Sequence, residues 1–85
     1  MVRVVLPSLL AAQADGRKRL DLEADTVGDA LRALPVADLV LDERGELRKY
    51  VNVYVDGDDA RESGGLAYTL IEAQEVRIVA MLSGG

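Results

Sequence analysis

The sequence has 85 residues, of which 49% are hydrophobic and 29% charged, and it contains no cysteine, histidine or tryptophan. This composition predicts one globular domain with a single core. It excludes disulfides, zinc or iron–sulfur sites with Cys or His ligands, and thiol or imidazole catalysis. Ten basic and fifteen acidic residues give a net charge of -5, which disfavours nucleic acid as a partner and favours a protein with a basic face.

The N-terminal segment allows two interpretations. Residues 2–6 alternate as in a strand with one buried face, and Pro7 ends that strand. The same apolar run reaches the A-x-A pattern of residues 12–14, which resembles a signal-peptide cleavage site. Pro7 interrupts the run and cleavage would remove the first strand, so we favour the strand. No apolar run approaches the length of about 20 residues that a membrane helix needs, and we expect a cytoplasmic protein without a membrane partner.

The next segment is expected to complete a hairpin. Between Ser8 and Gly16 we expect a loop in which Leu9 and Leu10 fold back onto the core, with turn chemistry at its end. Residues 18–23 then alternate again, with their two leucines pointing inward. The two strands are therefore predicted to pair through a connection longer than a tight turn.

Thr26 begins the clearest helix. Its hydroxyl can accept a hydrogen bond from the backbone N–H of Asp29, and the carboxylate of Asp29 suits the first helical turn. An apolar stripe with helical spacing predicts four buried residues: Val27, Ala30, Leu31 and Leu34. Pro35 ends the helix near Leu34. Residues 36–41 are expected to form one further helical turn that buries Val36, Leu39 and Val40.

Residues 50–55 form the strongest predicted strand, because they are β-branched or aromatic almost throughout. Polar turns are expected before it, at residues 42–46, and after it, at residues 56–59. Beyond these we expect a short edge strand at Ala60–Glu62, a glycine turn, and a final strand. The glycine turn is Ser63-Gly64-Gly65, and the final strand covers residues 76–80. Between them, the open end of the core is expected to be covered by Leu66, Leu70 and Ile71.

This order of elements predicts an α+β fold. A mixed sheet of four or five strands would carry one main helix across one face, with the first and last strands parallel at its centre. That is the β-grasp, or ubiquitin-like, arrangement. We assign residues 1–81 to the domain and residues 82–85 to a flexible C-terminal diglycine tail.

The tail suggests a chemical role. Glycine lacks a Cβ atom, so Gly84-Gly85 can form a thin thread that enters a narrow enzyme channel and presents the carboxylate of Gly85 as the reacting group. An ordinary frayed terminus is the alternative. We expect Gly84 and Ser83 to thread into the partner, and Leu82 and Met81 to bind it as apolar anchors. Packing of Met81 on its own sheet is the alternative for that residue.

Other side chains have simpler interpretations. The four acidic residues Asp56, Asp58, Asp59 and Glu62 are read as a solvated turn in preference to a cation site, because the twelve-residue calcium loop pattern is missing. Tyr50, Tyr54 and Tyr68 are expected to pack on the sheet. Arg77 and Lys49 are read as solvated residues, with contact to the acidic rim of a partner as the alternative.

Taken together, these segments resemble the small ubiquitin-like sulfur carriers of the MoaD/ThiS family, which includes the molybdopterin and thiamin carriers. The resemblance covers the whole chain and is strongest to the branch that supplies sulfur for cysteine biosynthesis. It rests on an ordered series of short motifs: Leu6-Pro7-Ser8-Leu9-Leu10, residues 50–55 followed by Asp58-Asp59-Ala60-Arg61, Ser63-Gly64-Gly65-Leu66, and Gly84-Gly85.

The resemblance implies a protein co-substrate, not an enzyme. A ubiquitin-activating-like adenylyltransferase and sulfurtransferase would use ATP to adenylate Gly85, and sulfur would then displace AMP to leave a covalent thiocarboxylate. No bound cofactor, catalytic side chain or metal ligand is expected in the carrier, which would be a monomer when free. In the cysteine branch the sulfur-accepting synthase uses pyridoxal phosphate, and a metallopeptidase frees the product.

The sequence leaves the final function open at two points. The sulfur could end in cysteine, in a cofactor or in a sulfur-containing natural product. A ubiquitin-like modifier that joins Gly85 to lysines would use the same adenylate, and a non-covalent β-grasp adaptor would not use the tail at all.

Overall fold

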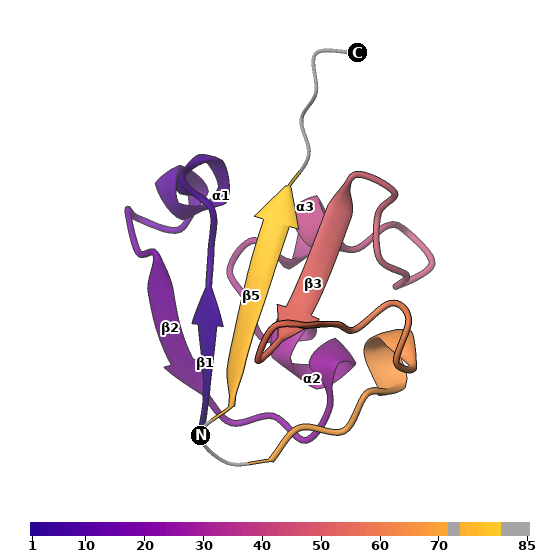
Figure 1. Ribbon diagram of the computed structural model, residues 1–85. Helices are drawn as coiled ribbons and strands as arrows, with labels where there is room; N and C mark the ends of the chain where they lie inside the picture. Colours follow the sequence, from indigo (N-terminus) through magenta and orange to yellow (C-terminus); the bar gives the residue numbers. More distant parts are fainter. Residues whose placement is uncertain (72–73, 81–85) are drawn as a thin grey trace.

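The computed structural model describes residues 1–71 and 74–80. Its strands form one five-stranded sheet with the order β2-β1-β5-β3-β4, in which β1 and β5 are parallel and the other neighbours antiparallel (Figure 1). The strands are β1 (Val2–Val5), β2 (Arg19–Leu22), β3 (Val51–Val55), β4 (Asp58–Asp59) and β5 (Glu75–Ala80). The helices are α1 (Ser8–Gln13), α2 (Val27–Arg32), α3 (Ala37–Val40) and the 3-10 turn η1 (Gly65–Ala67). The predicted β-grasp fold is confirmed.

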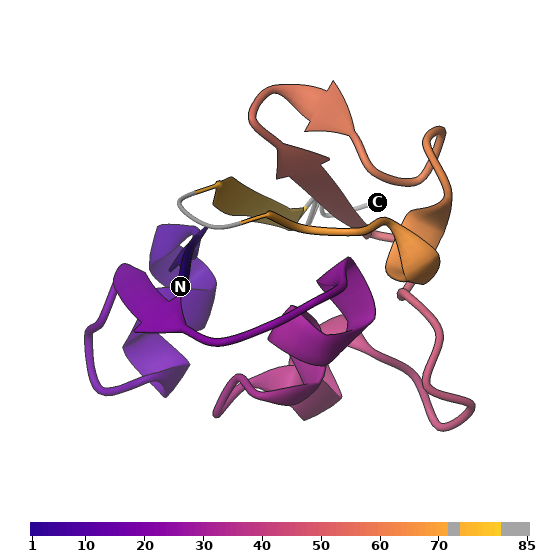
Figure 2. The ribbon, with the colours of Figure 1, turned by 90° about the horizontal axis from the view of Figure 1, so that it is seen from below.

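The helices α2 and α3 lie on one side of the sheet and leave its other face open (Figure 2). On the covered side, alternate residues of the inner strands are almost fully buried: Val2 and Val4, Val51, Val53 and Val55, and Val76 and Ile78. No polar or charged residue is buried among the described residues. The period-two alternation in the sequence therefore identified the core face of the strands correctly.

Helix α2 follows its prediction closely. The Thr26 hydroxyl accepts a hydrogen bond from the backbone N–H of Asp29 at 3.1 Å, and all four residues of the apolar stripe are buried. The backbone N–H of Val27 also donates to the carbonyl of Tyr68 at 3.0 Å. The start of α2 is thus fixed both by its own cap and by the segment that leads into β5.

The loop prediction for residues 8–16 is wrong, because Ser8–Gln13 forms helix α1. Pro7 precedes it in extended conformation and accepts a hydrogen bond from the backbone N–H of Ala11. One turn of helix places Leu10, Ala11 and Ala14 on the core side, and it leaves Leu9 54% exposed. Leu10 folds onto the core as predicted, whereas Leu9 does not.

Two further burial predictions are wrong. Leu39 is 39% exposed, because the buried residues Val36, just before helix α3, and Val40, at its end, lie four positions apart and share the inner face. Ile71 is 67% exposed, while Leu70 beside it is buried and Leu66 is partly buried against the core.

The short edge strand also lies earlier than predicted, at Asp58–Asp59 instead of Ala60–Glu62. Asp56 and Gly57 both have positive φ, 50° and 92°, which is the geometry of a two-residue hairpin turn. Val55 therefore pairs directly with Asp58. The Asp-Gly pair in the sequence is a known signal for this turn, and it indicates the correct start of the edge strand.

Candidate functional site

The carboxyl end of β5 is the candidate site, because β5 leads from the centre of the sheet toward residues 81–85 (Figure 1). Arg77 of β5 is in register with Val5 of β1, and Ala80 is in register with Val51 of β3. On the core side, Val76 and Ile78 are 0% and 2% exposed. β5 is therefore held by β1 as far as Arg77, by β3 as far as Ala80, and by the buried face beneath it.

Two arginines reinforce the start of β3, which is the segment beside Ala80. The Arg61 guanidinium donates to the carbonyls of Val51 at 2.7 Å and Arg48 at 3.1 Å. The Arg48 guanidinium in turn donates to the carbonyl of Asp38 at 3.0 and 3.2 Å. These bonds join the segment after β4, the start of β3 and helix α3. No local sequence pattern indicates this role for Arg48 or Arg61, because their partners are backbone carbonyls brought close only by the fold.

An apolar groove lies beside the carboxyl end of β5. We call it the β5-end groove, and it is lined by Leu9, Leu10 and Gln13 of α1, Leu39 of α3, Tyr50 and Ala80. Leu9, Leu39 and Tyr50 are 54%, 39% and 41% exposed, so their apolar surface faces solvent. Exposed apolar surface collected in one groove is typical of a surface that binds a partner.

Among the described residues, two carboxyl groups have a clearly shifted pKa, and both stabilise the fold and lie outside the groove lining. Asp42 has a lowered pKa mainly because its carboxylate accepts a hydrogen bond from the backbone N–H of Glu46. Asp29 has a lowered pKa mainly because the Arg32 guanidinium donates to it at 2.8 Å. Both shifts favour the ionised carboxylate at neutral pH.

Two of the four acidic residues around β4 accept hydrogen bonds from backbone amides. The Asp56 carboxylate accepts hydrogen bonds from the backbone N–H of Glu75 at 3.0 Å and from the Gln74 side chain at 3.1 Å. The Asp59 carboxylate accepts from the backbone N–H of Arg61 at 2.9 Å. Asp58 and Glu62 are exposed. Within residues 1–71 and 74–80 no cluster of acidic side chains is arranged to hold a metal ion.

The three tyrosines differ in their surroundings. Tyr68 packs against the core, Tyr54 is half-buried on the open face of the sheet, and Tyr50 lines the β5-end groove. Packing is thus the main role of Tyr68, whereas Tyr50 contributes to the candidate site.

Among the described residues no helix has the length and hydrophobicity needed to cross a membrane.

The tail predictions fall outside the described residues. Gly85 as the reacting residue, Gly84 and Ser83 as the thread, and Leu82 and Met81 as anchors therefore stay predictions, as does the division into residues 1–81 and 82–85. The structure describes the chain only as far as Ala80, and β5 is its last described element.

Residues 5–85 of the chain match the model of the ThiS family. The chain belongs to the ThiS family. Its sequence is 32% identical to the sulfur carrier protein CysO of Mycobacterium tuberculosis over 91 aligned positions, which cover 99% of this chain and 98% of the relative. The predicted resemblance to the MoaD/ThiS carriers, and within them to the cysteine branch, is therefore confirmed.

Solved structures agree with this assignment. The crystal structure of Mycobacterium tuberculosis CysO matches with a TM-score of 0.87 and 29% identity, over 96% of this chain and 100% of the other. The crystal structure of the Amycolatopsis orientalis BexX/CysO complex matches with a TM-score of 0.84 and 27% identity, over 100% of both chains. SAMP1 from Haloferax volcanii matches with a TM-score of 0.75 and 32% identity, over 99% of this chain and 98% of the other.

Proposed function

We propose that this chain is a sulfur carrier whose Gly85 carboxylate is adenylated and converted to a thiocarboxylate. The observation that carries the proposal is the nearly end-to-end match to curated sulfur carriers, together with a family match that extends through Gly85. The position of Gly84-Gly85 shortly after β5, the central strand, fits this role. The carrier would be a co-substrate, and its partner enzymes would supply the catalysis.

The chemistry requires two displacements at the terminal carboxyl group. A carboxylate oxygen attacks the α-phosphorus of ATP and releases pyrophosphate, which gives an acyl adenylate. Sulfide delivered by the partner then attacks the carbonyl carbon, the bond to AMP breaks, and a thiocarboxylate is left at Gly85. The folded body contributes position: it holds the reacting atom at a fixed reach within the partner's site.

The partners follow from this chemistry. An adenylyltransferase with sulfurtransferase activity loads the carrier, and a sulfur-accepting synthase unloads it. We propose cysteine formation by a pyridoxal-phosphate synthase, followed by release through a metallopeptidase, as the first route to test. The relative crystallised as a BexX/CysO complex supports a protein partner. We propose that the reaction takes place in the cytoplasm, where ATP is available, and that the free carrier is a monomer.

The proposal is tested by intact-mass analysis of the protein purified from its source cells. A mass gain equal to the exchange of one oxygen for sulfur, localised to Gly85 by fragmentation, is the expected result. A chain in which Gly85 is followed by another residue should show no gain. An unmodified Gly85 carboxylate under conditions of active sulfur metabolism would contradict the proposal.

A ubiquitin-like modifier is the second candidate, and the match to a small archaeal modifier protein, SAMP1, favours it. In that case the Gly85 carbonyl would form isopeptide bonds with lysine side chains. Source-cell extracts would then contain higher-mass conjugates that carry a Gly-Gly remnant on lysine after digestion. Full activity of a chain that lacks Gly84-Gly85 would instead indicate a non-covalent adaptor.

A further inference from the structure

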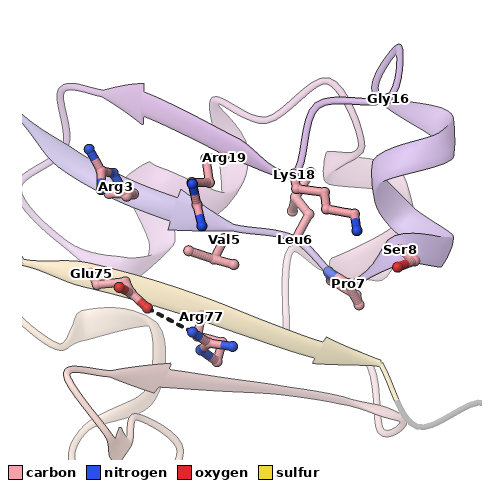
Figure 3. A pocket seen from close by; sticks show the side chains of 10 residues that line it. All are labelled: Arg3, Val5, Leu6, Pro7, Ser8, Gly16, Lys18, Arg19, Glu75 and Arg77. Carbon is pink, nitrogen blue, oxygen red and sulfur yellow. Dashed lines mark hydrogen bonds and ion pairs between the residues drawn. The ribbon is translucent and has the colours of Figure 1, made fainter.

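The open face of the sheet concentrates positive charge in a chain that is acidic overall. A shallow hollow on this face, which we call the basic hollow, is lined by ten residues that include Arg3, Lys18, Arg19 and Arg77 and a single carboxylate, Glu75 (Figure 3). Four of the ten basic residues of the chain therefore line one hollow, against one of the fifteen acidic residues. The net charge of -5 conceals this distribution.

Strand register explains how these cations come together. Val5 of β1 lies opposite Arg19 of β2 on one side and Arg77 of β5 on the other. Neighbouring strands lie about 4.8 Å apart, so the two arginines flank Val5 at a backbone separation of roughly 10 Å. Figure 3 shows Val5 lying between them, with Arg3 of β1 to one side and Lys18, just before β2, to the other.

The cations differ in how far their charge is already neutralised. Arg3 pairs with Asp21 at 3.3 Å, and Arg77 pairs with Glu75 at 3.2 Å, all four side chains being well exposed. Neither Lys18 nor Arg19 forms an ion pair within the described part of the chain, and both are exposed. These two side chains therefore present uncompensated charge to a partner.

The centre of this face is less polar than its rim. On the open side the sheet carries the side chains of Val5, Tyr54 and Val79. Each is half-buried, although no helix of the described chain covers this face. An apolar centre with charged residues at its edge is the usual composition of a protein–protein interface. Arg77 also lies only three residues before Ala80, so the hollow is about 10 Å along β5 from Ala80, the last described residue.

We propose that the basic hollow docks an acidic face of the enzyme that adenylates this chain; the inference rests on the function proposed above. Charge complementarity identifies the partner surface, since aspartate and glutamate side chains can pair with Lys18 and Arg19 while an apolar residue covers Val5. A nucleic acid fits less well, because Asp21 and Glu75 lie among the cations and the whole chain would be repelled by phosphates. Docking here aligns β5 with the enzyme before the tail is engaged.

The test compares two single charge reversals, Arg19→Glu in the hollow and Arg44→Glu in the turn between α3 and β3. Both residues are exposed and the change in net charge is the same. The probe is the adenylyltransferase of the same organism, with Kd measured by titration calorimetry. We expect Arg19→Glu to weaken binding about tenfold or more, and Arg44→Glu to change it less than about twofold. Arg19→Lys should retain most of the affinity.

A second measurement separates docking from chemistry. At saturating carrier, the maximal rate of adenylation should be the same for wild type and Arg19→Glu, because Gly85 itself is unchanged. Raising NaCl from about 0.05 M to about 0.5 M should weaken wild-type binding more than binding of Arg19→Glu. Urea unfolding of both variants checks that the fold is intact.

Several outcomes would overturn the docking proposal. Equal Kd values for wild type and Arg19→Glu would overturn it, because the hollow would then not contribute to binding. Equal weakening by Arg19→Glu and Arg44→Glu would also overturn it, because the effect would then come from net charge alone. Binding of a single-stranded oligonucleotide, or self-association, that is lost in Arg19→Glu while enzyme affinity is kept would assign the hollow to another ligand. The proposed function is tested separately by adenylation of the wild-type chain. If the wild-type chain is adenylated, only the docking proposal fails; if it is not adenylated, the docking proposal and the proposed function both fail.

Discussion

The two faces of the same sheet differ sharply in chemistry. Along β5, Val76 and Ile78 point into a core in which none of the described polar residues is buried, whereas Glu75 and Arg77 point to the open side and form an ion pair. Adjacent residues of one strand thus serve different purposes: one face supplies folding free energy and the other is available for recognition. A carrier benefits from this division, because its partner contacts can change without loss of the body that positions the tail.

The comparison is tested most strongly by substituting neighbours on opposite faces. Ile78→Ala removes apolar atoms from a fully buried site, and we expect a loss of roughly 2–5 kcal/mol in the free energy of unfolding. Val79→Ala is the matched change on the open face and should cost less than about 1 kcal/mol. Urea denaturation measures both.

A domain of this size has a stability of only about 5–15 kcal/mol, so Ile78→Ala could prevent folding. Ile78→Val, expected to cost about 0.5–1.5 kcal/mol, then provides the measurable comparison. Equal losses for the two alanine substitutions would show that the two faces of β5 do not differ in the way described.

The next largest effect is expected at Arg61, which joins separate segments near the end of β5. Arg61→Ala removes the hydrogen bonds to the carbonyls of Val51 and Arg48 and should cost about 1–2 kcal/mol. Arg44→Ala, which removes an exposed arginine with no side-chain hydrogen bond to another described residue, should cost less than about 0.5 kcal/mol. If the two variants unfold at the same urea concentration, Arg61 does not stabilise the start of β3.

The helix cap should contribute somewhat less. Thr26→Ala removes the acceptor for the backbone N–H of Asp29, and we expect a loss of about 1 kcal/mol in thermal or urea unfolding. Thr26→Ser keeps the hydroxyl and should recover most of that loss. Failure of serine to do so would indicate that packing of the threonine methyl group, not capping, stabilises the start of α2.

The smallest effect concerns pH and the turn at Asp42. Because hydrogen bonds from Glu46 and Arg44 lower its pKa below the ordinary value of 3.8, the carboxylate stabilises the fold above that pH. This contribution is lost as the pH falls through the lowered pKa. The difference in urea midpoint between wild type and Asp42→Asn should therefore be largest near neutral pH and should disappear in strong acid. A difference that is constant with pH would contradict this origin.

Much of the fold follows from local patterns in the sequence. Alternation identified the inner strands, and the Thr26 cap with its apolar stripe identified α2, because each pattern is complete within a few residues. Helix α1 was not predicted, since six residues are too few to establish helical periodicity. The start of β4 was misplaced because the Asp56-Gly57 turn was read as part of a longer loop.

Two of the wrong burial predictions concern residues of the candidate site. Leu9 and Leu39 were predicted to be buried, and both instead line the β5-end groove. Composition alone assigns a leucine to the core, while its exposure depends on how α1 and α3 pack against the end of the sheet. The basic hollow was likewise hidden, because it is assembled by the register of β2, β1 and β5. Local sequence therefore predicts the scaffold better than the surfaces that lie between elements.

The central claim is that a stable body presents Gly85 for adenylation. It is tested most directly by ATP–pyrophosphate exchange with the adenylyltransferase of the same organism, using the full chain and a chain that ends at Ser83. We expect exchange with the full chain and none with the shortened one, although both fold equally well. Equal exchange with the two chains would contradict it.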